Sequence, residues 1–141
     1  MTLVDTNVLI DVLSIDPVWF DWSAASLERQ GDVGPVFINE IVFAELCAQV
    51  DSEGELEQAL AELNVTLVRT PMQALFIAGK AYRRYRAAGG IRTGVLPDFF
   101  IGAHAAIAGY RLLTRDAARY RTYFPRLSSI APGSTGHAPR E

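Results

Sequence analysis

Residues 2–7 read Thr2-Leu3-Val4-Asp5-Thr6-Asn7, and the interpretation of the chain starts from this run. Its first three residues predict a short buried strand that stops at the carboxylate of Asp5. Thr6 or Asn7 is then expected to cap a helix, which continues through apolar residues as far as Leu13. The run therefore predicts a strand that passes directly into a helix, with an acidic side chain where the strand ends.

The same alternation of short apolar strands and helices continues along the chain. Further strands are predicted at 36–38, 65–68, 111–114 and 127–130, and helices after residue 17 and at 39–50, 53–63, 70–88, 97–108 and 116–120. This order is typical of a parallel sheet covered on both faces. We therefore predict an α/β fold, a three-layer α/β/α sandwich with a central, mostly parallel sheet, over residues 1–131. The tail 132–141, rich in Gly, Ser and Pro, is expected to be disordered.

Composition limits the classes of protein that need to be considered. A chain of 141 residues, half of them hydrophobic, suits one domain with a sizeable core. No apolar run approaches the roughly 18 residues that span a bilayer, and the first residues do not resemble a secretion signal. The single cysteine, Cys47, excludes an internal disulfide and is expected in the core. These features predict a cytoplasmic protein with no membrane contact.

Charge is distributed very unevenly along the sequence. Residues 1–79 carry thirteen acidic and two basic side chains, a net charge of −11. Residues 80–126 carry ten basic and two acidic side chains, a net charge of +8, and residues 127–141 sum to zero. The imbalance favours one positive surface that meets a polyanion or an acidic partner. The alternative is that the two halves of the chain pair with each other across the folded surface.

Four carboxylates occupy positions that are typical of a site rather than of a solvated surface. Asp5 and Asp116 follow predicted strands, and ligands of open parallel sheets bind beyond the carboxyl ends of the strands. Asp98 lies in the opening turn of the 97–108 helix, and Glu45 lies among apolar residues of the 39–50 helix. Each acid has a separate structural alternative, such as a favourable position in the dipole of a helix. One shared cluster explains all four more economically, and such a cluster suits a hard cation such as Mg²⁺ or Mn²⁺.

Other chemistries find less support among the residues present. Zinc sites use Cys and His, and the chain offers only Cys47, His104 and His137. His104 lies in an apolar helical stretch, where a packed histidine is more common than a catalytic base, so a serine-type triad is poorly supported. The glycine-rich residues 89–94 lack the GK[ST] ending of a phosphate-binding loop and are interpreted as a flexible linker.

The four acids, in this order and context, resemble those of the PIN-domain ribonucleases, and within them the VapC-type toxins of bacterial toxin–antitoxin pairs. The resemblance covers about residues 2–131. It is carried by Leu3-Val4-Asp5-Thr6-Asn7, Glu40-Ile41-Val42-Phe43-Ala44-Glu45-Leu46, Leu96-Pro97-Asp98-Phe99-Phe100-Ile101-Gly102-Ala103, Leu113-Thr114-Arg115-Asp116 and, near the end, residues 119–125.

The resemblance implies a function and a set of site residues. Asp5, Glu45, Asp98 and Asp116, here called the acidic quartet, match the carboxylates that hold the catalytic Mg²⁺ or Mn²⁺. Asn7 and Thr114 match polar positions that support them, whereas Glu40 is an extra acid that we expect to be peripheral. The implied substrate is RNA, and the implied protein partners are a cognate antitoxin and a second copy of the chain. Without a placed histidine base, hydrolysis is expected to use water activated by the cation and to leave 5′-phosphate and 3′-hydroxyl ends.

Two questions stay open from the sequence. The candidates for contacts with substrate phosphates or with an antitoxin are Arg83, Arg84, Arg86, Arg115 and Arg119. Trp19, Phe20 and Trp22 suit either the core or a protein interface. The alternatives to a ribonuclease are a non-catalytic binding module that docks an acidic protein, and a metal-dependent DNA nuclease or phosphatase that uses the same acids.

Overall fold

The computed structural model describes residues 1–92 and 94–133, and its centre is a five-stranded parallel sheet. The strand order is β3-β2-β1-β4-β5, and every neighbouring pair is parallel. The strands are β1 (Thr2–Val4), β2 (Val36–Ile38), β3 (Val65–Leu67), β4 (Arg111–Leu113) and β5 (Ser129–Ile130). The predicted parallel α/β architecture is confirmed. The expectation of a disordered tail falls almost entirely on residues 134–141, which lie outside the described residues.

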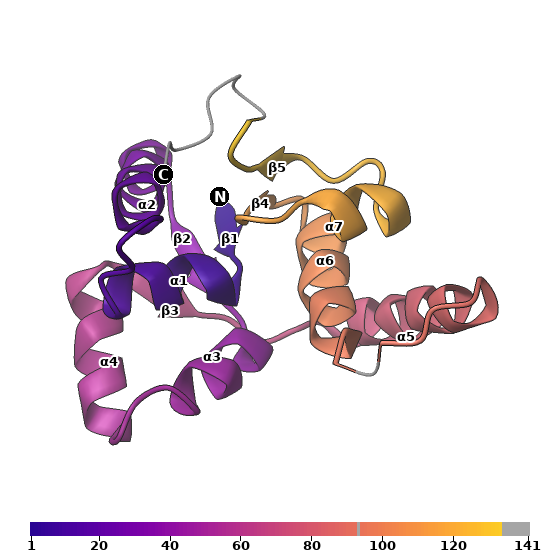
Figure 1. Cartoon of the computed structure of the whole chain (residues 1–141), viewed down its shortest axis with the longest axis horizontal. Helices are drawn as coiled ribbons and strands as arrows, with labels where there is room; N and C mark the ends of the chain where they lie inside the picture. Colours follow the sequence, from indigo (N-terminus) through magenta and orange to yellow (C-terminus); the bar gives the residue numbers. More distant parts are fainter. Residues whose placement is uncertain (93, 134–141) are drawn as a thin grey trace.

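Helices cover both sides of this sheet. Their bounds are α1 (Thr6–Leu13), α2 (Phe20–Val33), α3 (Glu40–Cys47), α4 (Glu53–Glu62), α5 (Met72–Ala87), α6 (Leu96–Ala108) and α7 (Ala118–Tyr123). Figure 1 shows α2 and α4 on one side of the strands, and α5, α6 and α7 on the other. The arrangement is the expected three-layer sandwich. In the part of the chain that the model describes, no helix has the length and apolar character needed to cross a membrane.

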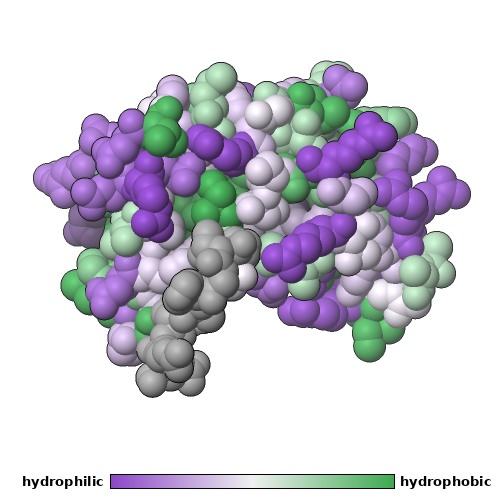
Figure 2. Space-filling view, turned by 90° about the horizontal axis from the view of Figure 1, so that it is seen from above, coloured by the Kyte–Doolittle hydropathy of each residue, from purple (hydrophilic) through white to green (hydrophobic). Residues whose placement is uncertain are grey.

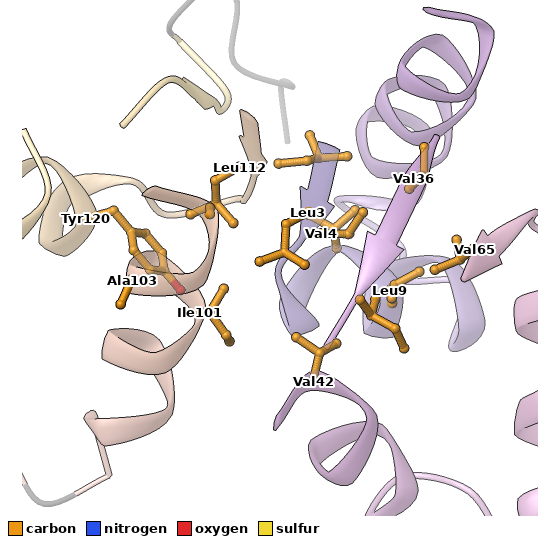
Figure 3. Packing of buried hydrophobic residues seen from close by; sticks show 14 of the residues in the cluster. Leu3, Val4, Leu9, Val36, Val42, Val65, Ile101, Ala103, Leu112 and Tyr120 are labelled. Carbon is orange, nitrogen blue, oxygen red and sulfur yellow. The ribbon is translucent and has the colours of Figure 1, made fainter. Parts of the chain in front are cut away.

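The core is built on the two faces of the central strand β1. Successive side chains of a strand point to opposite faces, so Leu3 and Val4, both without solvent exposure, pack in different layers. Figure 3 shows Leu3 on the side of Leu112 and Ile101, and Val4 on the side of β2. Because both faces of β1 are covered, its sequence is continuously buried rather than alternating, as the sequence predicted.

Three helix starts differ from the predicted ones. Asp5, not Thr6 or Asn7, caps α1: its backbone is extended (φ −72°, ψ 152°) and its side chain accepts from the Thr6 N–H. Helix α5 begins at Met72 rather than at residue 70, and the Thr70 hydroxyl donates to the side chain of Glu40. Helix α7 begins at Ala118 rather than at residue 116.

The prediction that Cys47 lies in the core is wrong, because this free cysteine is exposed. Helix α3 is apolar on most of its surface, so its sequence does not show which side is buried. Val42 and Leu46, four residues apart, face the core without exposure. Cys47 follows Leu46 directly and therefore points about 100° away from it around the helix.

The face at the amino ends of the strands is mixed in polarity. Figure 2 looks onto this face and shows small hydrophobic areas separated by hydrophilic residues. Asp5 and Asp116 follow β1 and β4 at their carboxyl ends, which are the opposite ends of the strands.

The close contact between α6 and α7 at Gly102 leads to a first prediction. A Cβ at Gly102 would lie 2.6 Å from the ring of Phe124 and 2.9 Å from the ring of Tyr120, both in or next to α7. Gly102→Ala should therefore destabilise the protein by about 1–3 kcal/mol through overpacking, measured by urea unfolding. The matched control is Gly79→Ala on α5, where nothing lies within 4 Å. It should stabilise by roughly 0.5–1 kcal/mol, because alanine favours the helix. Equal effects of both substitutions would contradict the packing described here.

Candidate functional site

The site lies where the order of the strands reverses. The chain runs outward from β1 through β2 to β3 and then returns to β4 on the other side of β1. In open α/β sheets such a switch point leaves a crevice at the carboxyl ends of the two strands. Asp5 follows β1 and Thr114 follows β4, so these two residues stand at the crevice. The Thr114 hydroxyl donates to Asp5 Oδ2 at 2.8 Å and joins the two strand ends.

Asp5 is the most buried member of the acidic quartet, with 5% of its surface exposed. Its Oδ1 accepts from the Thr6 N–H at 2.8 Å, and its Oδ2 accepts from the hydroxyls of Thr114 and Tyr120, the latter at 2.9 Å. The pKa of Asp5 is raised to about 6: burial raises it most and the nearby charge of Asp98 adds to the rise, whereas these hydrogen bonds lower it. The three donors therefore offset only part of the cost of burying this carboxylate.

Glu45 reaches the same region from α3. Its Oε1 accepts from the Thr6 hydroxyl at 2.6 Å, although the two residues are far apart in sequence. Thr6 thus donates its backbone N–H to Asp5 and its hydroxyl to Glu45. One residue at the start of α1 holds two carboxylates of the quartet side by side.

Asp98 comes from the first turn of α6 and is paired with Arg119 of α7. The guanidinium Nη1 of Arg119 donates to Asp98 Oδ2. Burial raises the pKa of Asp98, and the charges of Glu45 and Asp116 add to that rise, while Arg119 opposes it. Asp98 therefore lies within electrostatic reach of the other three acids.

Asp116 is the exposed member of the quartet. Its carboxylate accepts from the Ala118 N–H at 3.3 Å, near the start of α7. Its backbone N–H donates to the Thr114 hydroxyl at 3.2 Å. The segment that carries Asp116 is thus attached to the residue that supports Asp5.

Thr114 and Asn7, which were expected to support the acids, make different contacts. Thr114 has no solvent exposure and bonds directly to Asp5. The side-chain oxygen of Asn7 accepts from the Arg115 N–H at 3.1 Å, which links the start of α1 to the segment after β4. Asn7 therefore holds the backbone around the site rather than a carboxylate.

Arg115 has intramolecular partners that occupy its guanidinium. It forms a two-pronged ion pair with Asp11, with Nε–Oδ2 and Nη2–Oδ1 distances of 2.9 and 3.1 Å, and Asp11 is almost fully buried. Ser23 donates to the same carboxylate at 2.7 Å. The guanidinium also lies 5.1 Å from the centre of the Trp19 ring, a cation–π contact. These contacts join α1, α2 and the β4 end, and they use the group that we expected to meet a phosphate or an antitoxin.

The three remaining arginine candidates lie together on α5. Arg83, Arg84 and Arg86 are exposed, and no ion pair to them is found among residues 1–92 and 94–133. The same helix packs against α6 through aromatic contacts, with the rings of Tyr85 and Phe99 5.7 Å apart. The three arginines therefore lie on a helix that packs against Phe99, the residue next to Asp98.

Two residues of the site were missed by the sequence analysis. Tyr120 was noted only as part of the similar segment 119–125, yet its hydroxyl bonds to Asp5. Thr6 was considered only as a cap. Hydroxyls have no spacing signature of their own, and the segment after Asp116 was the only signal that pointed towards Tyr120.

Glu40 and His104 have structural partners away from the quartet. Glu40 accepts from the backbone N–H of Thr70 at 2.9 Å and from its hydroxyl, which joins α3 to the segment before α5. His104 is buried, its Nδ1 lies 3.2 Å from Asn39 Nδ2, and burial lowers its pKa. A packed histidine is what the sequence indicated.

The donor set can be tested against a metal ion. Within the described ranges, no three Asp, Glu, His or Cys side chains lie close enough together to hold an ion as they stand. The quartet nonetheless places several negative charges in mutual electrostatic reach, with Arg119 as their only ion-pair partner among the described residues. All the donors are oxygens, which suits a hard divalent cation. The residues therefore fit Mg²⁺ or Mn²⁺ chemically, and binding requires the carboxylates to draw closer together.

The chain was compared with known proteins. The family model described as PIN domain matches residues 2–125. No curated protein matches the chain by sequence. Solved structures similar to it include VapBC2 from Rickettsia felis bound to a promoter DNA fragment, with 20% identity, a TM-score of 0.69 and coverage of 92% of this chain and 97% of that one. VapBC-1 from nontypeable Haemophilus influenzae has 19% identity, a TM-score of 0.68 and coverage of 92% and 96%. A toxin–antitoxin complex from Klebsiella pneumoniae has 20% identity, a TM-score of 0.64 and coverage of 85% and 90%.

The contacts of Arg115 predict a large effect of its removal on stability. Arg115→Gln leaves the buried Asp11 without its cation and should lower the free energy of unfolding by about 2–3 kcal/mol. This is less than the roughly 3–5 kcal/mol typical of a fully buried ion pair, because the Arg115 guanidinium is partly solvated. Arg84→Gln, at an exposed arginine, should change it by less than about 0.5 kcal/mol. Chemical denaturation of both variants measures the difference, and a mild effect of Arg115→Gln would leave this arginine free for a ligand.

Proposed function

This chain belongs to the PIN domain family, and from that premise we propose that it is a Mg²⁺- or Mn²⁺-dependent endoribonuclease and the toxin of a toxin–antitoxin pair. PIN domains are nucleases, which hydrolyse phosphodiester bonds. The finer proposal concerns the cation, the RNA substrate and the antitoxin partner. In it, Asp5, Glu45, Asp98 and Asp116 hold the cation.

The observation that carries this proposal is the environment of the Tyr120 hydroxyl. Burial raises the pKa of Tyr120 well above its ordinary value, and the charges of Asp5, Asp98 and Glu45 raise it further. These acids come from the end of β1, from α6 and from α3. Three carboxylates from three elements therefore act on one hydroxyl, Asp5 through a hydrogen bond and Asp98 and Glu45 through their charge, and this concentration of negative charge supports cation binding.

The residues of the chain divide the work of such a site. Asp5 is held rigidly by Thr6, Thr114 and Tyr120, so its carboxylate is the fixed ligand of the set. Glu45 is aligned beside it, and Asp116, which is exposed, faces the solvent from which substrate arrives. A bound Mg²⁺ would supply an activated water and neutralise charge on the phosphate.

The exposed arginines of α5 support a polyanionic substrate. Arg83, Arg84 and Arg86 are free of ion pairs among the described residues and are candidates for contacts with the phosphates of RNA. Arg119 can serve the same purpose only after it leaves Asp98. We assign Arg115 to the framework instead, because its guanidinium is bound to Asp11.

The partner assignment rests on the similar structures. These are toxin–antitoxin complexes, such as the one from Klebsiella pneumoniae, and the likeness extends over most of both chains. We propose a cognate antitoxin as the partner of this chain, and homodimers as its assembly.

Removal of one carboxylate tests the proposed site. Asp98→Asn should abolish cleavage of RNA, by at least about 100-fold, because the cation loses a charged ligand. The fold should persist, since Asp98 is partly exposed and asparagine is nearly isosteric. Addition of EDTA to the wild type should have the same effect on cleavage. Asp21→Asn, at an exposed acid in the first turn of α2, is the control and should retain activity. Wild-type rates in Asp98→Asn would reject the assignment.

The chemistry of the product ends is a separate prediction. Water-mediated hydrolysis without a histidine base should leave 5′-phosphate and 3′-hydroxyl ends on the RNA. End-labelling before and after phosphatase treatment identifies them. Ends that carry a 2′,3′-cyclic phosphate would mean that the ribose hydroxyl attacks, and the mechanism would have to be abandoned.

A further inference from the structure

We propose that Arg119 is a built-in competitor of the divalent cation, which occupies Asp98 in the metal-free protein and must leave it before the acidic quartet can close around the ion. This inference rests on the proposed metal-dependent function and adds to it a control of cation affinity by a residue of the chain itself. The consequence is a site that binds its cation more weakly than its four carboxylates alone would.

The first support comes from the ion pair itself. Arg119 Nη1 donates directly to Asp98 Oδ2, and the two side chains retain 23% and 33% of their solvent exposure. The guanidinium is therefore neither locked into the core nor fully solvated. A cation that approaches Asp98 can displace it, and the displaced side chain can reach solvent.

The second support is a contrast among the four acids. Asp5 accepts from a backbone N–H and two hydroxyls, Glu45 from a hydroxyl, and Asp116 from a backbone N–H. These neutral donors leave the negative charge of each carboxylate in place for a cation. Asp98 alone has its charge compensated within the described residues, and it is also the acid whose environment includes both Glu45 and Asp116. The Arg119 guanidinium therefore pairs with Asp98, the carboxylate that an ion shared with Glu45 and Asp116 would also bind.

The third support is the anchoring of α7. Tyr120 and Phe124 pack against Gly102 of α6 so closely that no Cβ fits there. Tyr120 is also bonded to Asp5. These contacts hold Arg119, the residue before Tyr120, opposite the first turn of α6. The backbone position of Arg119 is therefore fixed by the packing, while its guanidinium is partly exposed and is held by Asp98.

The arrangement also differs from that of the other arginine in this region. Arg115 grips Asp11 with two donors, and that carboxylate is almost fully buried and lies outside the quartet. Within residues 1–92 and 94–133, Arg119 has no second hydrogen-bond or ion-pair acceptor besides Asp98. Arg115 joins elements of the framework through Asp11, whereas Arg119 pairs with Asp98, a residue of the site.

The test measures the affinity of the full chain for Mn²⁺ by isothermal titration calorimetry, without RNA. Arg119→Gln should bind Mn²⁺ about fivefold more tightly than the wild type, which corresponds to the loss of a partly exposed ion pair. Arg121→Gln removes an equal charge from the same helix at an exposed position and should leave the affinity unchanged. Equal gains in both variants, or no gain in Arg119→Gln, would overturn the proposal.

A double-mutant cycle separates competition at Asp98 from a general effect of charge. In the Asp98→Asn background, the substitution Arg119→Gln should leave the residual Mn²⁺ affinity unchanged, because the shared partner is gone. A fivefold gain that persists in this background would overturn the competition. Failure of the proposed function has a different signature: neither the wild type nor Arg119→Gln would bind Mn²⁺, and both proposals would fall. If the wild type binds Mn²⁺ and Asp98→Asn binds it less, the proposed function stands whatever Arg119→Gln does.

Discussion

The structure depends on one buried negative charge, the carboxylate of Asp5 at the end of the central strand. Burial of a carboxylate is costly unless donors surround it, and Asp5 is met by Thr6, Thr114 and Tyr120. These donors belong to the start of α1, the end of β4 and α7. The need to satisfy one side chain therefore ties the start of α1 to the end of β4 and to α7, which come more than a hundred residues later in the sequence.

The three donors offset only part of the free-energy cost of burying Asp5, and a bound cation would offset more of it. The pKa of Asp5 stays raised, at about 6, even with three donors, and the pKa of Asp98 is raised as well. A divalent cation would relieve both, because it favours the charged form of each carboxylate. A carboxylate whose pKa is raised on folding lowers the stability of the protein at neutral pH, a cost that is common at functional sites.

Two arginines close together in sequence show how the framework and the site are kept apart. Arg115 forms an ion pair with the buried Asp11 and a cation–π contact with Trp19. These contacts connect α1 and the start of α2 to the end of β4. Arg119 is held opposite Asp98 by the packing of α7 on Gly102. Sequence alone makes them equivalent members of a basic segment. Their partners differ because Arg115 lies between β4 and α7, next to Asp11 of α1, whereas Arg119 lies in α7, next to Asp98 of α6.

The sequence by itself determined the parallel α/β architecture and the central place of residues 2–4, because continuous burial on both faces of a strand leaves an unbroken apolar run. It also singled out Asp5, Glu45, Asp98 and Asp116, since acids at strand ends and on an apolar helix are costly without a partner. It failed for Cys47, because an apolar helix such as α3 does not reveal its buried side. Only the tertiary structure decided that Tyr120 and Thr6 support the carboxylates, and that Arg115 and Arg119 pair with different acids. Hydrogen bonds and ion pairs between distant segments depend on distances and directions in space, and no periodicity in the chain encodes these.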